Sequence, residues 1–247
     1  MQALLIDMDG TLIETESRWW VAERIVMENH GSTWDIDDQN MSIGGPMHKV
    51  VEYMAAKANS NADQINREII EAMLENFQKH PAQLLPGWEN ILNEARELGI
   101  KTALVTASYR VLAEALLERN GFVKYFDLVV TADDVKETKP FPEPYLKAAD
   151  EFGLKSLDCL VFEDSNTGVT SSLAAGMPTI ALPERVLLDA RRGMKILKSI
   201  KGMKIKDLKI IHNELKQEFQ ENLDKTPMTS EARAILENIR KRGLIGG

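Results

Sequence analysis

Apolar residues follow two different patterns in the N-terminal part of the chain. Ala3 to Ile6 form an apolar run that ends at Asp7, which predicts a short buried strand followed by a loop. From Glu16 to His80, apolar residues instead recur every three or four positions, which predicts helices. Three stripes carry this pattern: Trp19, Ala22, Ile25 and Val26; Val50, Val51, Met54, Ala55 and Ala58; and Ile65, Ile69, Met73 and Phe77. No strand pattern interrupts the segment, so we expect it to be helical throughout.

After Pro86-Gly87, predicted helices and strands alternate. The predicted strands are residues 102–106, 128–130, 160–162 and 179–181, each preceded by a predicted helix. Such alternation is typical of a parallel sheet covered by helices on both faces. The expected fold class is therefore α/β, with a Rossmann-like parallel sheet and an inserted all-α cap domain. The predicted domains are an α/β core of residues 1–14 and 83–211, a helical cap of residues 15–82, and a C-terminal helical tail of residues 212–247.

The tail region combines a basic segment with two more apolar stripes. The stripes are Ile211, Leu215, Phe219 and Leu223, and then Ala232, Ile235, Leu236 and Ile239. Between Lys195 and Lys209 the chain holds six lysines without interleaved aromatic residues, so we expect solvated surface rather than a nucleic-acid site. The apolar stripes have to be buried, and we expect them to pack against the core, another partner or a second subunit of a homodimer.

Composition narrows the class of protein. The chain has 247 residues, of which 44% are hydrophobic and 28% charged, as in ordinary globular proteins. Its one cysteine, Cys159, lies in an apolar run and has no partner for a disulfide within the chain. The N-terminus enters a predicted strand at once, unlike a signal peptide, and no apolar run approaches the ~18 residues of a membrane span. We therefore expect a cytoplasmic protein without a membrane partner.

Two carboxylates follow the first predicted strand. Because alternate residues of a strand point to the same side, Asp7 and Asp9 are expected to share one small space. Their repulsion requires a cation or a shared proton, and Gly10 lets the backbone approach a ligand closely. These features favour Mg²⁺-dependent phosphoryl transfer, with one carboxylate as nucleophile and the other as acid and base. A polar strand end or a helix N-cap is the alternative, and a calcium loop fits less well because its glycine belongs at the sixth position.

Polar residues also follow the next three predicted strands. They are Thr106 and Ser108, on either side of Ala107, at the end of the second strand, Lys139 after the third, and Glu163 and Asp164 after the fourth. Each has an ordinary alternative explanation, as a helix N-cap or a solvated surface residue. However, ligands of parallel sheets bind beyond the carboxyl ends of the strands, where these residues would meet Asp7. Hydroxyls and a lysine suit phosphoryl oxygens, and carboxylates suit Mg²⁺.

The order of these motifs resembles a known family. The stretch Asp7 to Thr11, the strand-end Thr106, the pair Lys139-Pro140 and the stretch Phe162 to Gly168 resemble the four motifs of the haloacid dehalogenase superfamily. The helical insertion after the first motif is similar to that of the subgroup with an α-helical cap. This subgroup includes sugar-phosphate phosphatases and β-phosphoglucomutase. The likeness covers roughly residues 1–210.

The resemblance implies an activity and a role for each site residue. The implied roles are Asp7 as nucleophile, Asp9 as general acid and base, Thr106, Ala107 and Lys139 as phosphate ligands, and Asp7, Asp9 (through its carbonyl oxygen), Glu163 and Asp164 as ligands of a Mg²⁺ cofactor. The implied activity is hydrolysis of a small phosphorylated metabolite, a phosphate monoester, through an aspartyl-phosphate intermediate.

Cap residues are expected to contact the substrate. The segment of residues 42–49 holds Gly44 and Gly45, which permit close approach, and His48 and Lys49, which suit a polar ligand. A helix–helix turn with solvated ends is the alternative for this segment. Trp19 is the other predicted cap contact.

Two positions bear on the choice between hydrolase and mutase. β-Phosphoglucomutases usually carry a histidine ten positions after the acid/base aspartate, where this chain has Trp19. They also usually carry a lysine after the serine of the second motif, where this chain has Tyr109. Both differences favour a phosphatase over a β-phosphoglucomutase-like phosphotransferase. We expect its substrate to be a small organic phosphate, a sugar or polyol phosphate. A third hypothesis, a non-catalytic protein that binds an acidic partner through its basic tail, does not explain the complete catalytic set.

Overall fold

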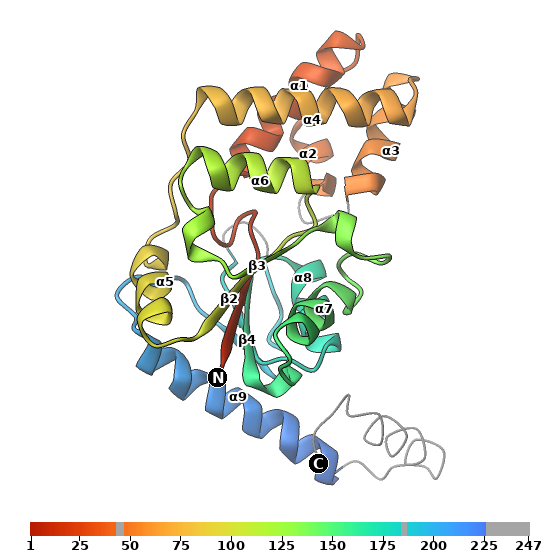
Figure 1. Cartoon of the computed structure of the whole chain (residues 1–247). Helices are drawn as coiled ribbons and strands as arrows, with labels where there is room; N and C mark the ends of the chain where they lie inside the picture. The colour runs from red at the N-terminus through yellow and green to blue at the C-terminus, as the bar shows by residue number, and fades with distance from the viewer. Residues whose placement is uncertain (43–46, 184–186, 226–247) are drawn as a thin grey trace.

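The computed structural model describes residues 1–42, 47–183 and 187–225 (Figure 1). The second predicted stripe of the tail, Ala232 to Ile239, lies outside these residues, as do Gly44 and Gly45.

A single six-stranded sheet forms the centre of the protein. Its strands are β1 (Ala3–Ile6), β2 (Lys101–Val105), β3 (Leu128–Val130), β4 (Cys159–Glu163), β5 (Thr179–Ala181) and β6 (Met194–Ile196). They lie in the order β3-β2-β1-β4-β5-β6, and every neighbouring pair is parallel. The predicted α/β fold with a parallel sheet is therefore confirmed. β1, which precedes the two aspartates, lies between β2 and β4.

Helices cover both faces of this sheet. They are α5 (Trp88–Glu97), α6 (Arg110–Arg119) and α9 (Ile205–Lys225) on one face, and α7 (Glu143–Glu151) with α8 (Asn166–Ala174) on the other. Leu4 and Ile6 of β1 pack toward α5 and α6, while Ala3 and Leu5 pack toward α7. This strand is apolar at every position because both of its faces are buried. The described part of the core also holds three short 3₁₀ helices: η1 (Val123–Tyr125), η2 (Ala132–Asp134) and η3 (Ser156–Asp158).

Among the described residues, four helices lie between β1 and α5 in the sequence, and we call them the cap. They are α1 (Glu16–Asn29), α2 (Ile36–Ser42), α3 (Met47–Ala58) and α4 (Ala62–Lys79). The cap stands over the carboxyl ends of the strands (Figure 1) and has an apolar core of its own, which includes Met27, Met54 and Ile69. The Arg18 guanidinium donates to the carbonyl oxygens of His80 and Pro81 at 2.7 and 2.9 Å. The two segments that join cap and core are therefore held side by side.

The buried face of α1 differs from the predicted one. Ile25, which we expected in the apolar stripe, is 47% exposed, whereas Glu23 is only 3% exposed. The buried residues of α1 include Ala22, Glu23 and Val26. The predicted burial of Ala22 and Val26 is confirmed, whereas the prediction was wrong at Ile25, because the helix is turned so that Glu23 and not Ile25 faces inward.

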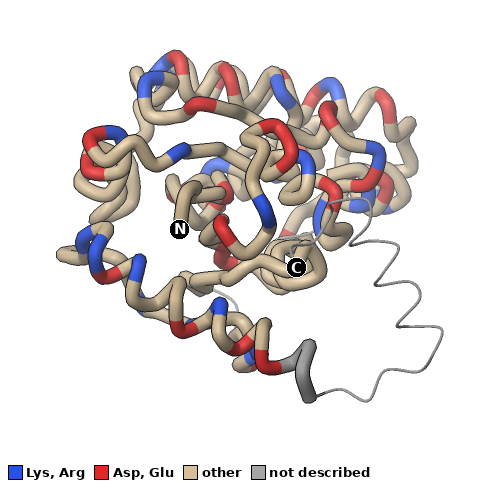
Figure 2. Tube along the Cα trace, turned by 60° about the horizontal axis from the view of Figure 1, so that its bottom comes forward, with Lys and Arg blue, Asp and Glu red and all other residues tan. Residues whose placement is uncertain are grey.

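The last described helix, α9, packs against the core. Its buried residues Leu208, Ile211 and Leu215 belong to the main apolar core, and the predicted boundary after residue 211 falls inside the helix. Figure 2 shows basic and acidic residues interspersed along α9, as on a solvated surface. Within the described residues, no helix is both long and apolar enough to cross a membrane.

Candidate active site

One buried lysine connects the ends of three strands. Lys139, which is 4% exposed, donates from Nζ to Asp7 Oδ1 at 2.6 Å and to Glu163 Oε1 at 2.6 Å. It also donates to the carbonyl oxygen of Val105 at 2.8 Å. These partners lie at the ends of β1, β4 and β2 respectively. The structure thus brings together the strand-end residues that the sequence pointed to.

An acidic cluster surrounds this lysine. Oxygen atoms of Asp7, Glu163 and Asp164 all lie within 4.8 Å of one another. Gly10 has a φ of +79°, and a Cβ atom at this position would lie 2.2 Å from Asp164 Oδ2, so the site requires glycine. Carboxylate oxygens are hard ligands of the kind that Mg²⁺ prefers, and this donor set fits such an ion.

The charges of the cluster are unbalanced. Burial raises the pKa of Asp7, and the negative charges of Glu163 and Asp9 add to this effect while Lys139 opposes it. Burial likewise raises the pKa of Asp164, again with a contribution from Asp7. Burial disfavours the charge on Lys139, yet Asp7 and Glu163 raise the pKa of its ammonium above the usual value. One ammonium faces three carboxyl groups, so a divalent cation would relieve the remaining repulsion.

Glu163 lies behind Lys139 and is completely buried. Its Oε1 also accepts a hydrogen bond from the Tyr145 hydroxyl at 2.5 Å, and its Oε2 accepts from Ser165 Oγ at 3.3 Å. A Cβ atom on Gly168 would lie 1.9 Å from the Glu163 carboxyl carbon. The first turn of α8 therefore leaves room for Glu163 only because residue 168 is glycine.

Four side chains donate to the carboxylate of Asp9. Thr15 Oγ1 and Trp19 Nε1 lie 2.6 and 3.1 Å from Oδ1, and both come from the start of the cap. Ser108 Oγ and Thr106 Oγ1 lie 2.8 and 3.4 Å from Oδ2, and both follow β2. Asp9 is therefore oriented by hydroxyl and indole groups from cap and core together.

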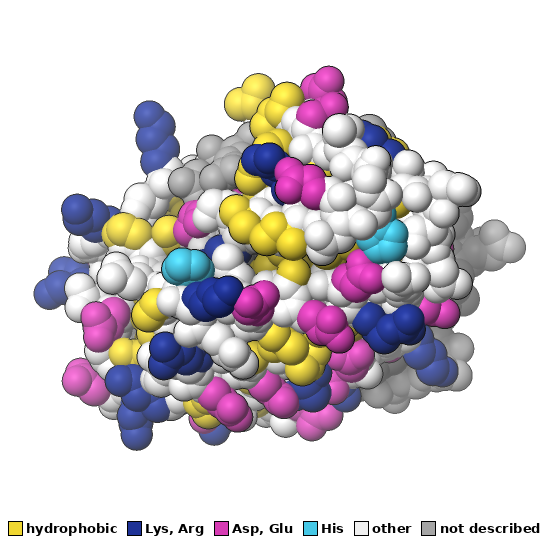
Figure 3. All heavy atoms as spheres, turned by 90° about the horizontal axis from the view of Figure 1, so that it is seen from above, with side chains coloured by type: hydrophobic (Ala, Val, Ile, Leu, Met, Phe, Trp, Pro, Cys, Tyr) yellow, Lys and Arg dark blue, Asp and Glu magenta, His cyan; other side chains and the backbone are white. Residues whose placement is uncertain are grey.

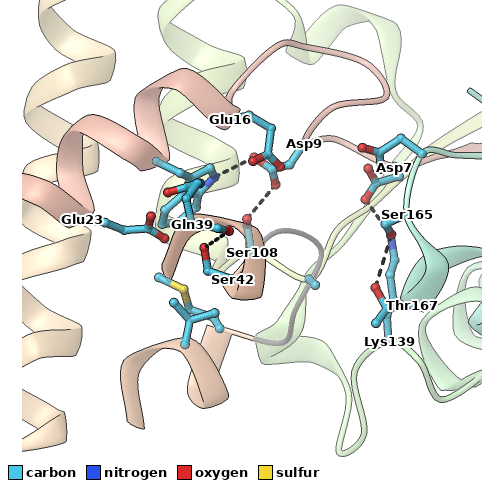
Figure 4. Close-up of a pocket in the computed structure, with 15 residues that line it drawn as sticks. Asp7, Asp9, Glu16, Glu23, Gln39, Ser42, Ser108, Lys139, Ser165 and Thr167 are labelled. Atoms are coloured by element: carbon cyan, nitrogen blue, oxygen red, sulfur yellow. Dashed lines mark hydrogen bonds and ion pairs between the residues drawn. The ribbon is translucent and has the colours of Figure 1, made fainter. Parts of the chain in front are cut away.

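A cavity separates the cap from these core residues. It is lined by Asp7, Asp9, Glu16, Trp19, Glu23, Gln39, Ser42, Met47, Val50, Ala107, Ser108, Lys139, Asp164, Ser165 and Thr167. Figure 4 shows Asp7 and Lys139 toward the core side, with Glu23 and Gln39 on the cap side. Six of the predicted site residues thus lie on the cavity wall: Asp7, Asp9, Trp19, Ala107, Lys139 and Asp164.

Sequence reasoning missed the polar wall on the cap side. Trp34 Nε1 donates to Glu23 Oε2 at 2.9 Å and lies 3.2 Å from Gln39 Oε1. All three side chains are buried, and burial raises the pKa of Glu23 to about 8. A signal for Glu23 was present in the sequence, because it stands four residues after Trp19 and three before Val26, at helical spacing.

His48 and Lys49 are not brought to this cavity. Both side chains are exposed on α3, whereas their neighbours Met47 and Val50 line the cavity. Residues three apart share a helix face, so the intervening pair points elsewhere. Seen from above, the surface carries acidic and basic side chains side by side (Figure 3).

Comparison with known proteins adds independent evidence. Residues 4–182 match the haloacid dehalogenase-like hydrolase family. The chain is 32% identical to fructose-1-phosphate phosphatase YqaB of Escherichia coli, over 72% of this chain and 94% of that protein. It is 31% identical to the phosphorylated carbohydrates phosphatase of Thermotoga maritima, over 73% of this chain and 84% of that protein. The crystal structure of CbbY from Rhodobacter sphaeroides, in complex with phosphate, has a TM-score of 0.76 at 24% identity, over 85% of this chain and 99% of that one.

These findings agree with the geometry of the strand ends. The matched segment contains the aspartates after β1, the cap, Lys139 and the acidic pair after β4. The similarity to the CbbY structure is a similarity of fold, whereas the two curated relatives match over most of their own length and are phosphatases. The chain belongs to the haloacid dehalogenase-like hydrolase family, and it is a phosphatase.

Proposed function

We propose that this phosphatase requires Mg²⁺, forms an aspartyl-phosphate at Asp7 and hydrolyses a small sugar or polyol phosphate. The observation that carries the proposal is the buried contact of Lys139 with Asp7, next to the carboxyl groups of Glu163 and Asp164. A phosphate dianion is repelled by a carboxylate nucleophile unless positive charge offsets the repulsion. The names of the two phosphatase relatives, which specify fructose 1-phosphate and phosphorylated carbohydrates, support the substrate class.

The cluster supplies the groups that this chemistry requires. Asp7, the carbonyl oxygen of Asp9 and Asp164 would hold Mg²⁺, with Glu163 as the remaining acid of the cluster. When bound, the ion offsets the charge of the phosphoryl oxygens. Lys139, Thr106 and the backbone at Ala107 would bind these oxygens from the protein side.

The reaction then takes two steps. An oxygen of Asp7 attacks the phosphorus in line, and the bond from phosphorus to the alcohol oxygen breaks. Asp9 donates a proton to the departing alkoxide. In the second step Asp9 takes a proton from a water molecule, which attacks the aspartyl-phosphate and releases inorganic phosphate. The cap excludes bulk water during both steps.

The test combines turnover with detection of the intermediate. Purified protein is assayed with p-nitrophenyl phosphate in Mg²⁺ and in EDTA, and acid-quenched reactions are digested for mass spectrometry. We expect hydrolysis in Mg²⁺, its loss in EDTA, and one added phosphoryl group on the peptide that contains Asp7. Equal rates in EDTA would overturn the metal requirement, and a phosphoryl group on another peptide would overturn the nucleophile assignment.

A mutase activity is tested separately. Trp19 stands at the position of the mutase histidine, and its indole donates to Asp9. Given β-glucose 1-phosphate and a glucose bisphosphate primer, we expect release of inorganic phosphate. Accumulation of glucose 6-phosphate without phosphate release would contradict the hydrolase proposal.

A further inference from the structure

The cap end of the cavity has a chemistry different from that of the core end. Glu23 of α1 and Gln39 and Ser42 of α2 line it, beside the apolar Met47 and Val50. The core end holds the phosphoryl-transfer residues, so the cap end faces the alcohol part of a bound phosphate ester. Figure 4 shows Glu23 and Gln39 on this opposite side, away from Lys139.

A buried indole fixes the polar groups of this wall. Trp34 Nε1 lies 2.9 Å from Glu23 Oε2 and 3.2 Å from Gln39 Oε1. With the carboxamide oxygen directed at Trp34, the Gln39 nitrogen is left as the donor for a ligand. The pKa of Glu23, raised to about 8 by burial, favours a protonated carboxyl group near neutral pH, which both donates and accepts. Hydroxyl groups, which also donate and accept, are its natural partners.

The described residues of the cap-side wall offer no positively charged side chain to a second anionic group of the substrate. Among the described residues that line the cavity, Lys139 is the one lysine or arginine, and it already contacts Asp7 and Glu163. The cap contributes two acids to the lining, Glu16 and Glu23. Residues 43–46, whose sequence is Ile-Gly-Gly-Pro, add no charged side chain. A carboxylate or second phosphate buried here would lie beside the carboxyl groups of Glu16 and Glu23, which is unfavourable.

We propose, building on the phosphatase function proposed above, that Glu23 and Gln39 form a hydroxyl-binding subsite. This subsite selects phosphate monoesters whose alcohol part is hydroxylated and uncharged, and it rejects phosphorylated acids and bisphosphates. Glu23 and Gln39 are thus specificity residues that contact the part of the substrate away from the phosphorus.

Matched substrates test the charge selection. Sorbitol 6-phosphate and 6-phosphogluconate differ at the far end of the chain by a hydroxymethyl group against a carboxylate. Glycerol 3-phosphate and 3-phosphoglycerate form a shorter pair with the same difference. We expect kcat/KM to be at least about tenfold higher for the uncharged member of whichever pair is turned over faster. Equal values, the reverse order, or hydrolysis of p-nitrophenyl phosphate with none of the four esters would overturn the proposal.

Variants of Glu23 test the subsite itself. For Glu23→Leu we expect the loss of kcat/KM on the preferred hydroxylated ester to exceed the loss on p-nitrophenyl phosphate by at least about tenfold. Glu23→Gln keeps the shape, a donor and an acceptor, so it should retain most of the preference. Glu71→Leu, on the exposed surface of α4, is the matched control. Thermal melting of each variant shows whether the protein remains folded. If Glu23→Leu does not fold, Glu23→Gln tests the proposal, which requires that this variant retain the preference.

The outcomes distinguish the two proposals. The subsite would be overturned if Glu23→Leu lost kcat/KM equally on both substrates, or if Glu23→Gln lost the preference. In either case, hydrolysis of p-nitrophenyl phosphate by the unmodified chain would still support the phosphatase mechanism. Failure of the unmodified chain to hydrolyse any of these esters in Mg²⁺ would overturn the proposed function, and the subsite with it.

Discussion

The indole nitrogen of Trp19 lies 3.1 Å from Oδ1 of Asp9, across the boundary between the cap and the core. Asp9 is the proposed acid and base, and Trp19 is the cap residue that occupies the position of the mutase histidine. A cap side chain therefore helps to orient a catalytic group when the cap lies over the sheet, and this contact leads to the first prediction.

Trp19→Phe should lower kcat/KM roughly tenfold, because it removes a hydrogen bond to a carboxylate worth about 1.5 kcal/mol while keeping an aromatic ring. The matched control is Trp20→Phe, since the neighbouring Trp20 packs within the cap and does not line the cavity. Steady-state kinetics on one substrate would compare the two. Equal losses in both variants would show that the contact with Asp9 has no specific role.

Asp7→Asn should reduce turnover by at least about 1000-fold, because the amide cannot act as the nucleophile. Its fold should persist, since the substitution is nearly isosteric and removes one acid from a cluster with too little positive charge. Circular dichroism checks the fold, and mass spectrometry excludes deamidation back to aspartate. Asp63→Asn, exposed on α4, should leave turnover unchanged. A rate near that of the unmodified chain would disprove the nucleophile assignment.

Mg²⁺ should stabilise the folded protein even without substrate. The cluster holds three carboxyl groups, two of which pair with Lys139, so an ion that binds only the folded cluster adds about 2.7 kcal/mol of stability at a concentration 100 times its Kd. Differential scanning fluorimetry in MgCl₂ and in EDTA measures the shift in melting temperature. Asp164→Asn should diminish this shift, whereas Asp150→Asn, exposed on α7, should keep it. A full shift in Asp164→Asn would place the ion elsewhere.

Leu215→Ala should lower the free energy of unfolding by about 2–5 kcal/mol, because Leu215 of α9 is only 2% exposed and packs in the main core. Ile210 lies on the same helix but is 59% exposed, so Ile210→Ala should change stability by less than about 0.5 kcal/mol. Urea unfolding of both variants tests whether α9 is part of the cooperative core. Similar small effects would mean that the helix contributes little to stability.

Acid should destabilise the protein through His212. This residue of α9 is fully buried, and burial, helped by the positive charges of the N-terminus and Lys216, lowers its pKa to about 4. The unfolded chain, with a histidine pKa near 6.5, binds the proton more readily. The stability that His212 provides is therefore complete above about pH 6.5 and is lost as the pH falls toward 4, by at most about 1.4 kcal/mol per pH unit.

Because the pKa values of Asp7 and Asp164 are raised, these two groups make the folded protein less stable as the pH rises, which is opposite to the effect of His212. The measurement therefore compares variants that differ only at a histidine. Urea unfolding between about pH 5 and pH 8 should show a shallower loss of stability in His212→Gln than in the unmodified chain. His80→Gln, whose side chain is exposed, controls for the loss of a histidine as such. Identical pH dependences in all three proteins would refute the role of His212.

The core site was predictable because its signals are local. In β1, β2 and β4, apolar residues are followed at once by a functional group, as with Ile6 and Asp7 or Phe162 and Glu163. Parallel strands then gather these ends by topology alone. Tyr145 gives no such signal, since its contact with Glu163 spans 18 positions and depends on how α7 packs beside β4.

The cap was less predictable for a related reason. Apolar periodicity assumes that a buried helix face is apolar, and it therefore assigned Ile25 inward and gave no role to Glu23. Ile25 and Glu23 have the opposite arrangement because α1 borders the cavity at Glu23, while Val26 and Met27 pack in the apolar core of the cap. His48 and Lys49 had suitable chemistry, but the rotation of α3, set by the packing of Val50 and Met54, directs them elsewhere.

Thr15 connects the start of the cap with the catalytic side of the core. It precedes the first residue of α1, and its hydroxyl donates to Asp9 at 2.6 Å. A swing of α1 away from the sheet would withdraw this hydroxyl together with the Trp19 indole. Asp9 therefore keeps these two hydrogen-bond donors only while α1 lies over the sheet. If the cap opened to admit substrate or release product, Asp9 would lose both donors in the same movement, so an oriented acid and base would exist only in the closed protein.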